Sequence, residues 1–72
     1  MKINMSEKAA QILKDARISQ GLTQVEVAQA AGMNPNSYAK IERGETRPST
    51  ESLGKLVKAL KISPSDIPDL LS

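Results

Sequence analysis

The spacing of apolar residues along the chain predicts a series of short helices. In the first segment, from about Ser6 to Gln20, Ala9, Leu13 and Ala16 recur at the three- and four-residue intervals that place side chains on one face of a helix. Glycines separate the segments that show this spacing. The nearest approach to a strand-like alternation is residues 23–27, where a helix start signal takes precedence. The pattern therefore predicts an all-α chain.

Two short helices follow, and each opens with a strong start signal. Thr23 and Glu26 have the spacing of a capping box, in which the hydroxyl and the carboxylate each accept a hydrogen bond from a backbone amide. Asn34 fits an N-cap, with Pro35 in the first helical position. Gly32 lies between these two segments, so we expect a tight turn there.

A fourth helix is predicted to begin at Ser49 or Thr50. Gly54 lies inside it, where glycine costs about 1 kcal/mol relative to alanine, so we expect a close helix contact at that position. The apolar stripe of this helix comprises Leu53, Leu56, Val57 and Leu60.

The C-terminal segment carries one more cap. Ser63 followed by Pro64 predicts a short helix that runs through Ile67, and we expect Pro68 to interrupt it. With the four segments before it, this predicts a compact bundle of five helices.

The chain is expected to form one domain over residues 1–72, with its core at about residues 6–67 and a short apolar tail at residues 68–72. A chain of 72 residues buries only a small core, and it has no cysteine for a disulfide. Its stability must therefore come from well-packed helices or from dimerisation.

Composition limits the chemistry that the chain can perform. It has no histidine and no cysteine, and we find neither paired carboxylates on one face nor a glycine-rich phosphate loop. We therefore expect no enzyme activity, metal, cofactor or small-molecule ligand. No signal peptide or membrane span is recognisable, which favours a cytoplasmic location and no membrane partner. Ten Lys and Arg against eight Asp and Glu give a net charge of +2, which permits nucleic-acid binding without arguing for it.

Three residues in the second helix and the turn after it have a spacing that constrains how the second and third helices pack. Gln24, Ala28 and Gly32 are four residues apart. A small side chain at Ala28 lets two helices cross steeply, and Gly32 permits the sharp turn that a short connection requires. Tyr38 and Ile41 fill the angle from the other side. This arrangement is typical of a helix-turn-helix formed by the second and third helices.

A wider set of residues carries a family resemblance. The set comprises Arg17, Leu22-Thr23-Gln24, Ala28, Gly32, Ile41-Glu42-Arg43-Gly44 and Pro48-Ser49…Leu53…Leu56…Ala59-Leu60. From about Leu13 to Ile67, the chain resembles the phage-repressor type of helix-turn-helix domain, the Cro/cI-like or xenobiotic-response-element family. The resemblance implies a compact five-helix, lambda-repressor-like fold that binds double-stranded DNA, often as a homodimer on a pseudo-palindromic operator.

The third helix supplies the candidate base contacts. In such a motif the recognition helix enters the major groove with its N-terminal residues toward the base edges. Asn36 can bond adenine and Lys40 can reach guanine, whereas Ser37 is less selective and Pro35 could touch only a thymine methyl group. The bland alternatives are that Lys40 is a solvated residue and that Asn36 and Ser37 merely suit a helix start. The predicted base contacts are Asn34, Pro35, Asn36, Ser37 and Lys40.

Candidate phosphate contacts flank that helix. In the docking mode that the resemblance implies, Gln24 points to a backbone phosphate, and residues near the loop after the third helix reach the other side of the groove. The resemblance also pairs Arg17 with Glu42 as an ion pair between the first and third helices, and Arg17 could reach a phosphate as well. The predicted phosphate contacts are Thr23, Gln24, Arg43, Thr46, Arg47 and Arg17.

Two apolar features remain to be placed. Tyr38 is the only aromatic residue; it could stack on a base, but we favour a ring packed in the core with its hydroxyl at the rim. The C-terminal group Ile67, Leu70 and Leu71 is the candidate two-fold dimer contact, because it adds more apolar area than so small a monomer should leave exposed.

Taken together, these features predict a sequence-specific DNA-binding transcriptional regulator, most often a repressor. The alternative is a protein-interaction module on the same fold, either an antitoxin-like partner or a bridging coactivator, because the fold alone does not determine function.

Overall fold

The fold was analysed as a computed structural model that describes residues 5–71, without the side chains of residues 5, 6, 69 and 71. The regular elements among the described residues are all helices, with no strand, which confirms the all-α class. The elements are α1 (Met5–Ser19), α2 (Gln24–Ala30), α3 (Pro35–Glu42), α4 (Thr50–Leu60), a single 3-10 turn η1 (Pro64–Asp66) and α5 (Ile67–Leu71).

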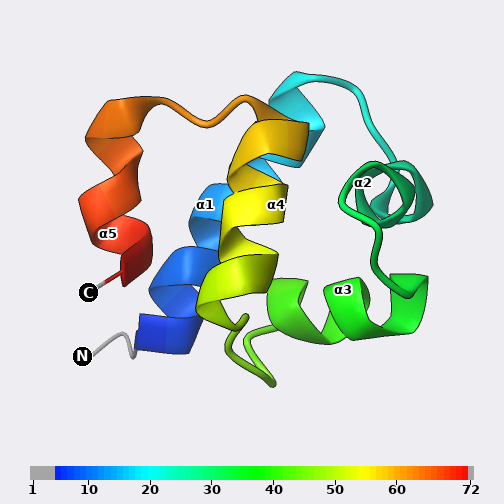
Figure 1. Cartoon of the computed structure of the whole chain (residues 1–72), viewed down its shortest axis with the longest axis horizontal. Helices are drawn as coiled ribbons and strands as arrows, with labels where there is room; N and C mark the ends of the chain where they lie inside the picture. Colours follow the sequence, from blue (N-terminus) through cyan, green and yellow to red (C-terminus); the bar gives the residue numbers. More distant parts are fainter. Residues whose placement is uncertain (1–4, 72) are drawn as a thin grey trace.

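The longest helices, α1 and α4, form the centre of the molecule (Figure 1). The short helix α5 packs on α1 at one end. At the other end α2 packs on α4, while α3 packs on both α1 and α2. None of the helices in the described part of the chain is long and apolar enough to cross a membrane.

The core is a single cluster to which every α-helix contributes. Leu13 of α1, Tyr38 of α3 and Leu56 of α4 are completely buried within it. Full burial of a large apolar side chain stabilises a fold by about 1.5–3 kcal/mol, so such a cluster can hold helices that are individually too short to be stable. The members are Ala9, Leu13, Val27, Ala28, Ala31, Tyr38, Ile41, Leu53, Leu56, Leu60, Ile62 and Leu70.

Leu70, beyond the predicted core of residues 6–67, belongs to this cluster. Leu70 is only 2% exposed, because η1 turns the chain back and α5 lays this side chain against the cluster. Leu70 is therefore not available as a surface dimer contact in the folded chain. Pro68 does not interrupt the helix either. It lies in the first turn of α5, where a backbone N–H has no acceptor within the helix.

Gly54 also differs from its prediction. It is exposed on α4, and a Cβ atom built on it would meet nothing among the described residues within 4 Å. No close helix contact therefore explains this glycine, and the structure offers no other reason for it.

Candidate nucleic-acid interface

The connection between α2 and α3 is a tight turn that depends on Gly32. This residue has a φ angle of +67°, in the left-handed region that glycine adopts without strain. The Met33 amide donates to the Ala28 carbonyl at 2.8 Å, and the Gly32 amide donates to the Gln29 carbonyl at 3.1 Å. These bonds satisfy the last carbonyls of α2 as the chain reverses.

The turn sets α2 and α3 at a steep angle. Figure 1 shows α2 end-on and α3 from the side. Ala28 is completely buried, which is what the spacing of small residues predicted for the contact between the two helices. This is the geometry of a helix-turn-helix.

Both helices start at the predicted caps. The Thr23 hydroxyl accepts a hydrogen bond from the Glu26 amide at 3.1 Å, and the Glu26 carboxylate accepts one from the Thr23 amide at 2.8 Å. At the start of α3, the Asn34 side chain accepts a hydrogen bond from the Asn36 amide at 2.8 Å, and Pro35 is the first helical residue. The caps fix where each helix begins and so which residues α3 presents to solvent.

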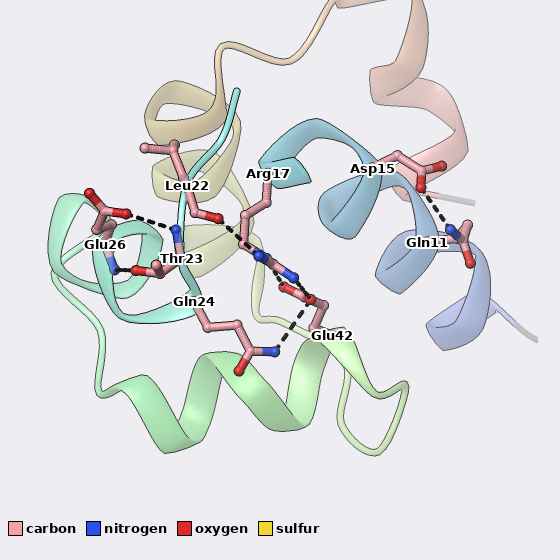
Figure 2. A network of polar contacts seen from close by, with 8 residues as sticks. All are labelled: Gln11, Asp15, Arg17, Leu22, Thr23, Gln24, Glu26 and Glu42. Atoms are coloured by element: carbon pink, nitrogen blue, oxygen red, sulfur yellow. Dashed lines mark hydrogen bonds and ion pairs between the residues drawn. The ribbon is translucent and has the colours of Figure 1, made fainter. Parts of the chain in front are cut away.

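An ion pair between Arg17 and Glu42 ties α1 to α3, as the resemblance implied (Figure 2). The guanidinium donates through Nε at 2.9 Å and through an Nη atom at 2.7 Å to the two carboxylate oxygens of Glu42. Its other Nη atom donates to the Leu22 carbonyl, also at 2.9 Å. All three guanidinium nitrogens are therefore bonded within the chain, and the side chain is only 16% exposed. These bonds use three of the five N–H donors of the guanidinium, so the phosphate contact of Arg17 stays a prediction.

Gln24 extends the network to α2. Its side-chain amide donates to Glu42 at 3.3 Å, so one carboxylate connects α1, α2 and α3 (Figure 2). Gln24 is half-buried at the first position of α2, with one amide proton committed to Glu42. The sequence placed Gln24 in the spacing of the helix-turn-helix and suggested it for phosphate binding, but it gave no sign of this contact.

Tyr38 lies in the core, as favoured, but its hydroxyl does not reach the surface. The whole residue is 0% exposed, and the phenolic oxygen has no hydrogen-bond partner that meets geometric criteria among the described residues. Burial, together with the neighbouring Glu42 carboxylate, raises the pKa of the Tyr38 hydroxyl well above its usual value. Tyr38 is therefore closed to base stacking in this fold.

The carboxylate of Glu42 makes stability depend on pH. Burial opposes its ionisation, but hydrogen bonds from Arg17 and Gln24 outweigh burial and lower the pKa of Glu42 below its usual 4.5. A depressed folded-state pKa gives stability that is present above the unfolded-state pKa and is lost as pH falls through the folded-state pKa. We expect the melting temperature to fall between about pH 5 and pH 3, and to fall less in Glu42→Gln. Identical pH profiles of the two proteins by circular dichroism would contradict this role.

The residues predicted to read bases lie together at the start and along the outer side of α3. All of them are exposed, whereas Tyr38 and Ile41, on the inner side of the same helix, are buried in the core. The side-chain oxygen of Asn34, Oδ1, accepts the capping hydrogen bond. The side-chain NH₂ group of Asn34 remains to bond a base. The exposed set is Asn34, Pro35, Asn36, Ser37 and Lys40.

The predicted phosphate contacts, apart from Arg17, lie at the two ends of this helix pair. Thr23 and Gln24 are at the start of α2, while Arg43, Thr46 and Arg47 are exposed in and near the loop that follows α3. The bond from Gln24 to Glu42 brings the start of α2 to the C-terminal end of α3, where the loop with the other donors begins, and the phosphate contacts of these residues stay predictions.

The sequence analysis assigned no role to Glu45, a charged residue in this region. The Arg43 guanidinium donates through Nε to the Glu45 carboxylate, and both side chains are largely exposed. This ion pair raises the pKa of Arg43 and lowers the pKa of Glu45. The available signal was a pair of opposite charges on either side of Gly44.

Two short helices that cross steeply, the second with its inner side in the core and its polar outer side exposed, define a helix-turn-helix protein. The chain belongs to the Cro/cI-like helix-turn-helix family: the family model described as helix-turn-helix matches residues 13–67.

Comparison with known proteins adds one curated relative and two solved structures. Over 56 residues the chain is 38% identical to the transcriptional regulator ClgR of Mycobacterium tuberculosis (strain ATCC 25618 / H37Rv), covering 78% of this chain and 50% of the relative. The chain thus spans about half the length of the curated relatives that it matches.

Both solved structures superpose closely on the chain. The clp gene regulator ClgR from C. glutamicum matches with a TM-score of 0.85 and 27% identity, over 97% of this chain and 92% of that one. The restriction-modification controller protein C.Esp1396I, a tetramer in complex with its natural 35 base-pair operator, matches with a TM-score of 0.80 over 99% and 100% of the two chains. Its identity is 22%, so this second likeness shows the fold alone.

Proposed function

We propose that the chain is a sequence-specific transcriptional regulator that binds double-stranded DNA through the exposed face of α3. It acts in the cytoplasm as a repressor, and it binds a pseudo-palindromic operator as a dimer. Membership of the helix-turn-helix family and the likeness to transcriptional regulators support this function.

One observation carries the proposal: the outer side of α3 is polar and exposed while its inner side is fixed in the core. Asn36 and Lys40 are exposed on the helix whose Tyr38 and Ile41 are buried. An amide and an ammonium are the groups that bond adenine and guanine edges in the major groove. The packed inner side of α3 fixes its backbone before binding. Little conformational entropy is therefore lost when these groups contact the bases.

The dimer follows from the size of the reading surface. One eight-residue recognition helix covers only a few base pairs, and a two-fold axis supplies a second half-site one helical turn away. Of the predicted dimer group, Leu70 is in the core and the Leu71 side chain lies outside the described residues. Ile67, which is partly exposed at the start of α5, remains the proposed contact.

Selection from a random duplex library tests the proposal. We expect the purified chain to enrich a short inverted repeat, and gel shifts on that duplex to show affinity that falls steeply as salt rises. A single half-site without its repeat would remove the dimer from the proposal. Failure to enrich any sequence, with no effect of salt, would overturn the DNA-binding function and favour the alternative of a protein-interaction module.

A further inference from the structure

We propose that Glu45 is a built-in competitor of DNA phosphate for the Arg43 guanidinium. In the free chain Glu45 occupies this cation, and DNA binding must exchange the carboxylate for a phosphate oxygen. The inference rests on the proposed function, because it assumes that Arg43 approaches the DNA backbone when α3 enters the groove.

The position of Glu45 is fixed by the way α3 ends. Gly44 has a φ angle of +77°, its amide donates to the Ile41 carbonyl at 3.0 Å, and the Glu45 amide donates to the Lys40 carbonyl at 2.9 Å. These two bonds close the last turn of the recognition helix and hold the backbone of Glu45 against it. The Glu45 carboxylate then accepts its hydrogen bond from Arg43 Nε, two residues earlier in the chain.

The fold itself does not account for an acid at this place. The C-terminal end of a helix carries partial negative charge, so a carboxylate there is unfavourable and a cation is preferred. Ion pairs between exposed side chains add little to stability, and here the side chains of Arg43 and Glu45 are 55% and 53% exposed. Both groups are thus open to a duplex, and neither is needed to hold the core.

The chemistry of the pair matches that of the expected ligand. A guanidinium binds carboxylate and phosphate oxygens with the same donor geometry, so Glu45 presents Arg43 with an anion that a phosphate can replace. The hydrogen bond from Arg43 lowers the pKa of Glu45, and the nearby charge of Lys40 acts in the same direction, so the competitor keeps its charge at neutral pH. Because the exchange involves no base edge, its cost is the same for every DNA sequence.

The expected result is a gain of affinity without a change of preference. Glu45→Gln should bind the duplex enriched by the wild-type chain, and a scrambled duplex of the same composition, about threefold to tenfold more tightly, by the same factor for both. The slope of affinity against salt in a log–log plot should stay close to that of the wild-type chain, because the contact from Arg43 to a phosphate forms in both proteins.

Two comparisons by fluorescence anisotropy make the test specific. Glu51→Gln removes an equal charge from an exposed ion pair on α4, in which Glu51 Oε1 lies 3.6 Å from Lys55 Nζ. This control variant should change the affinity for DNA less than twofold. In an Arg43→Gln background, most of the gain from Glu45→Gln should disappear. An equal gain from Glu51→Gln, or an undiminished gain without Arg43, would show that Glu45 acts only through net charge and would overturn the inference.

This outcome is separable from failure of the proposed function. If the wild-type chain binds duplex DNA with a salt dependence and Glu45→Gln binds no more tightly, the competitor role is wrong and the proposed function stands. If the wild-type chain binds no duplex at all, the proposed function is wrong and the inference falls with it.

Discussion

Arg17→Met is expected to destabilise the fold by about 3 kcal/mol, because it leaves the Glu42 carboxylate buried without its main partner. The Glu42 side chain is only 3% exposed, and its hydrogen bond from Gln24 is the longest in the network at 3.3 Å. A domain of this size has a total stability of roughly 4–10 kcal/mol, so a third or more would be lost. Urea unfolding followed by circular dichroism measures the change, and we expect the melting temperature to fall by about 10–20 °C.

Two further variants separate the charge from the volume of the side chains. Glu42→Gln should cost less than Arg17→Met, because the 16% exposed guanidinium can still reach water and the Leu22 carbonyl. The double variant Arg17→Met/Glu42→Leu should recover most of the loss, since an apolar pair of similar size carries no buried charge. If Arg17→Met changed the free energy of unfolding by less than about 1 kcal/mol, or if the double variant were the least stable of the three, the ion pair would not have the role assigned to it.

The features that could be predicted from the sequence are those that a few adjacent residues determine. The helix starts at Thr23 and Asn34 were predicted correctly because a capping side chain bonds an amide two or three residues away. The fourth helix was predicted to begin at Ser49 or Thr50, and it begins at Thr50 with Ser49 as its cap. The turn at Gly32 was also predicted correctly, because the tight connection between α2 and α3 needs one residue in the left-handed conformation. The Arg17–Glu42 pair was foreseen only through the family resemblance, because the two residues are 25 positions apart.

The errors arose where the arrangement of distant segments decides the outcome. Nothing local to Leu70 indicates that η1 returns it to α1, so a buried side chain was read as an exposed one. The depth of Tyr38 likewise depends on how the helices pack around it, and its hydroxyl is buried. Gly54 is a different case: it lies about 100° around α4 from Leu53, away from the apolar stripe, so its exposure could have been predicted from the helical period.

The base-reading and phosphate-binding roles of the exposed residues predict different losses. Lys40→Ala is expected to reduce affinity for the enriched duplex by roughly tenfold, and to relax the preference at one base position, because a contact to a guanine edge is lost. Arg47→Ala should weaken binding to enriched and scrambled duplexes by the same factor and reduce the salt slope by about one. A base contact is distinguished from a phosphate contact by comparing the two variants: only Lys40→Ala should change the base preference, although both variants lose affinity.

The measurement is a repeated library selection with each variant, followed by titrations of the enriched and scrambled duplexes at two salt concentrations. Lys58→Ala is the matched control: it removes the same charge from the exposed side of α4 and should leave both affinities within about twofold. If Lys40→Ala weakened every sequence equally, Lys40 would be a phosphate contact or a general source of positive charge, and the base preference of α3 would have to come from Asn36 and Ser37. Because Lys40 is one turn further along the exposed side of α3 than Asn36, a positive result also orients the helix: the altered base position should lie beside the one that Asn36→Ala relaxes.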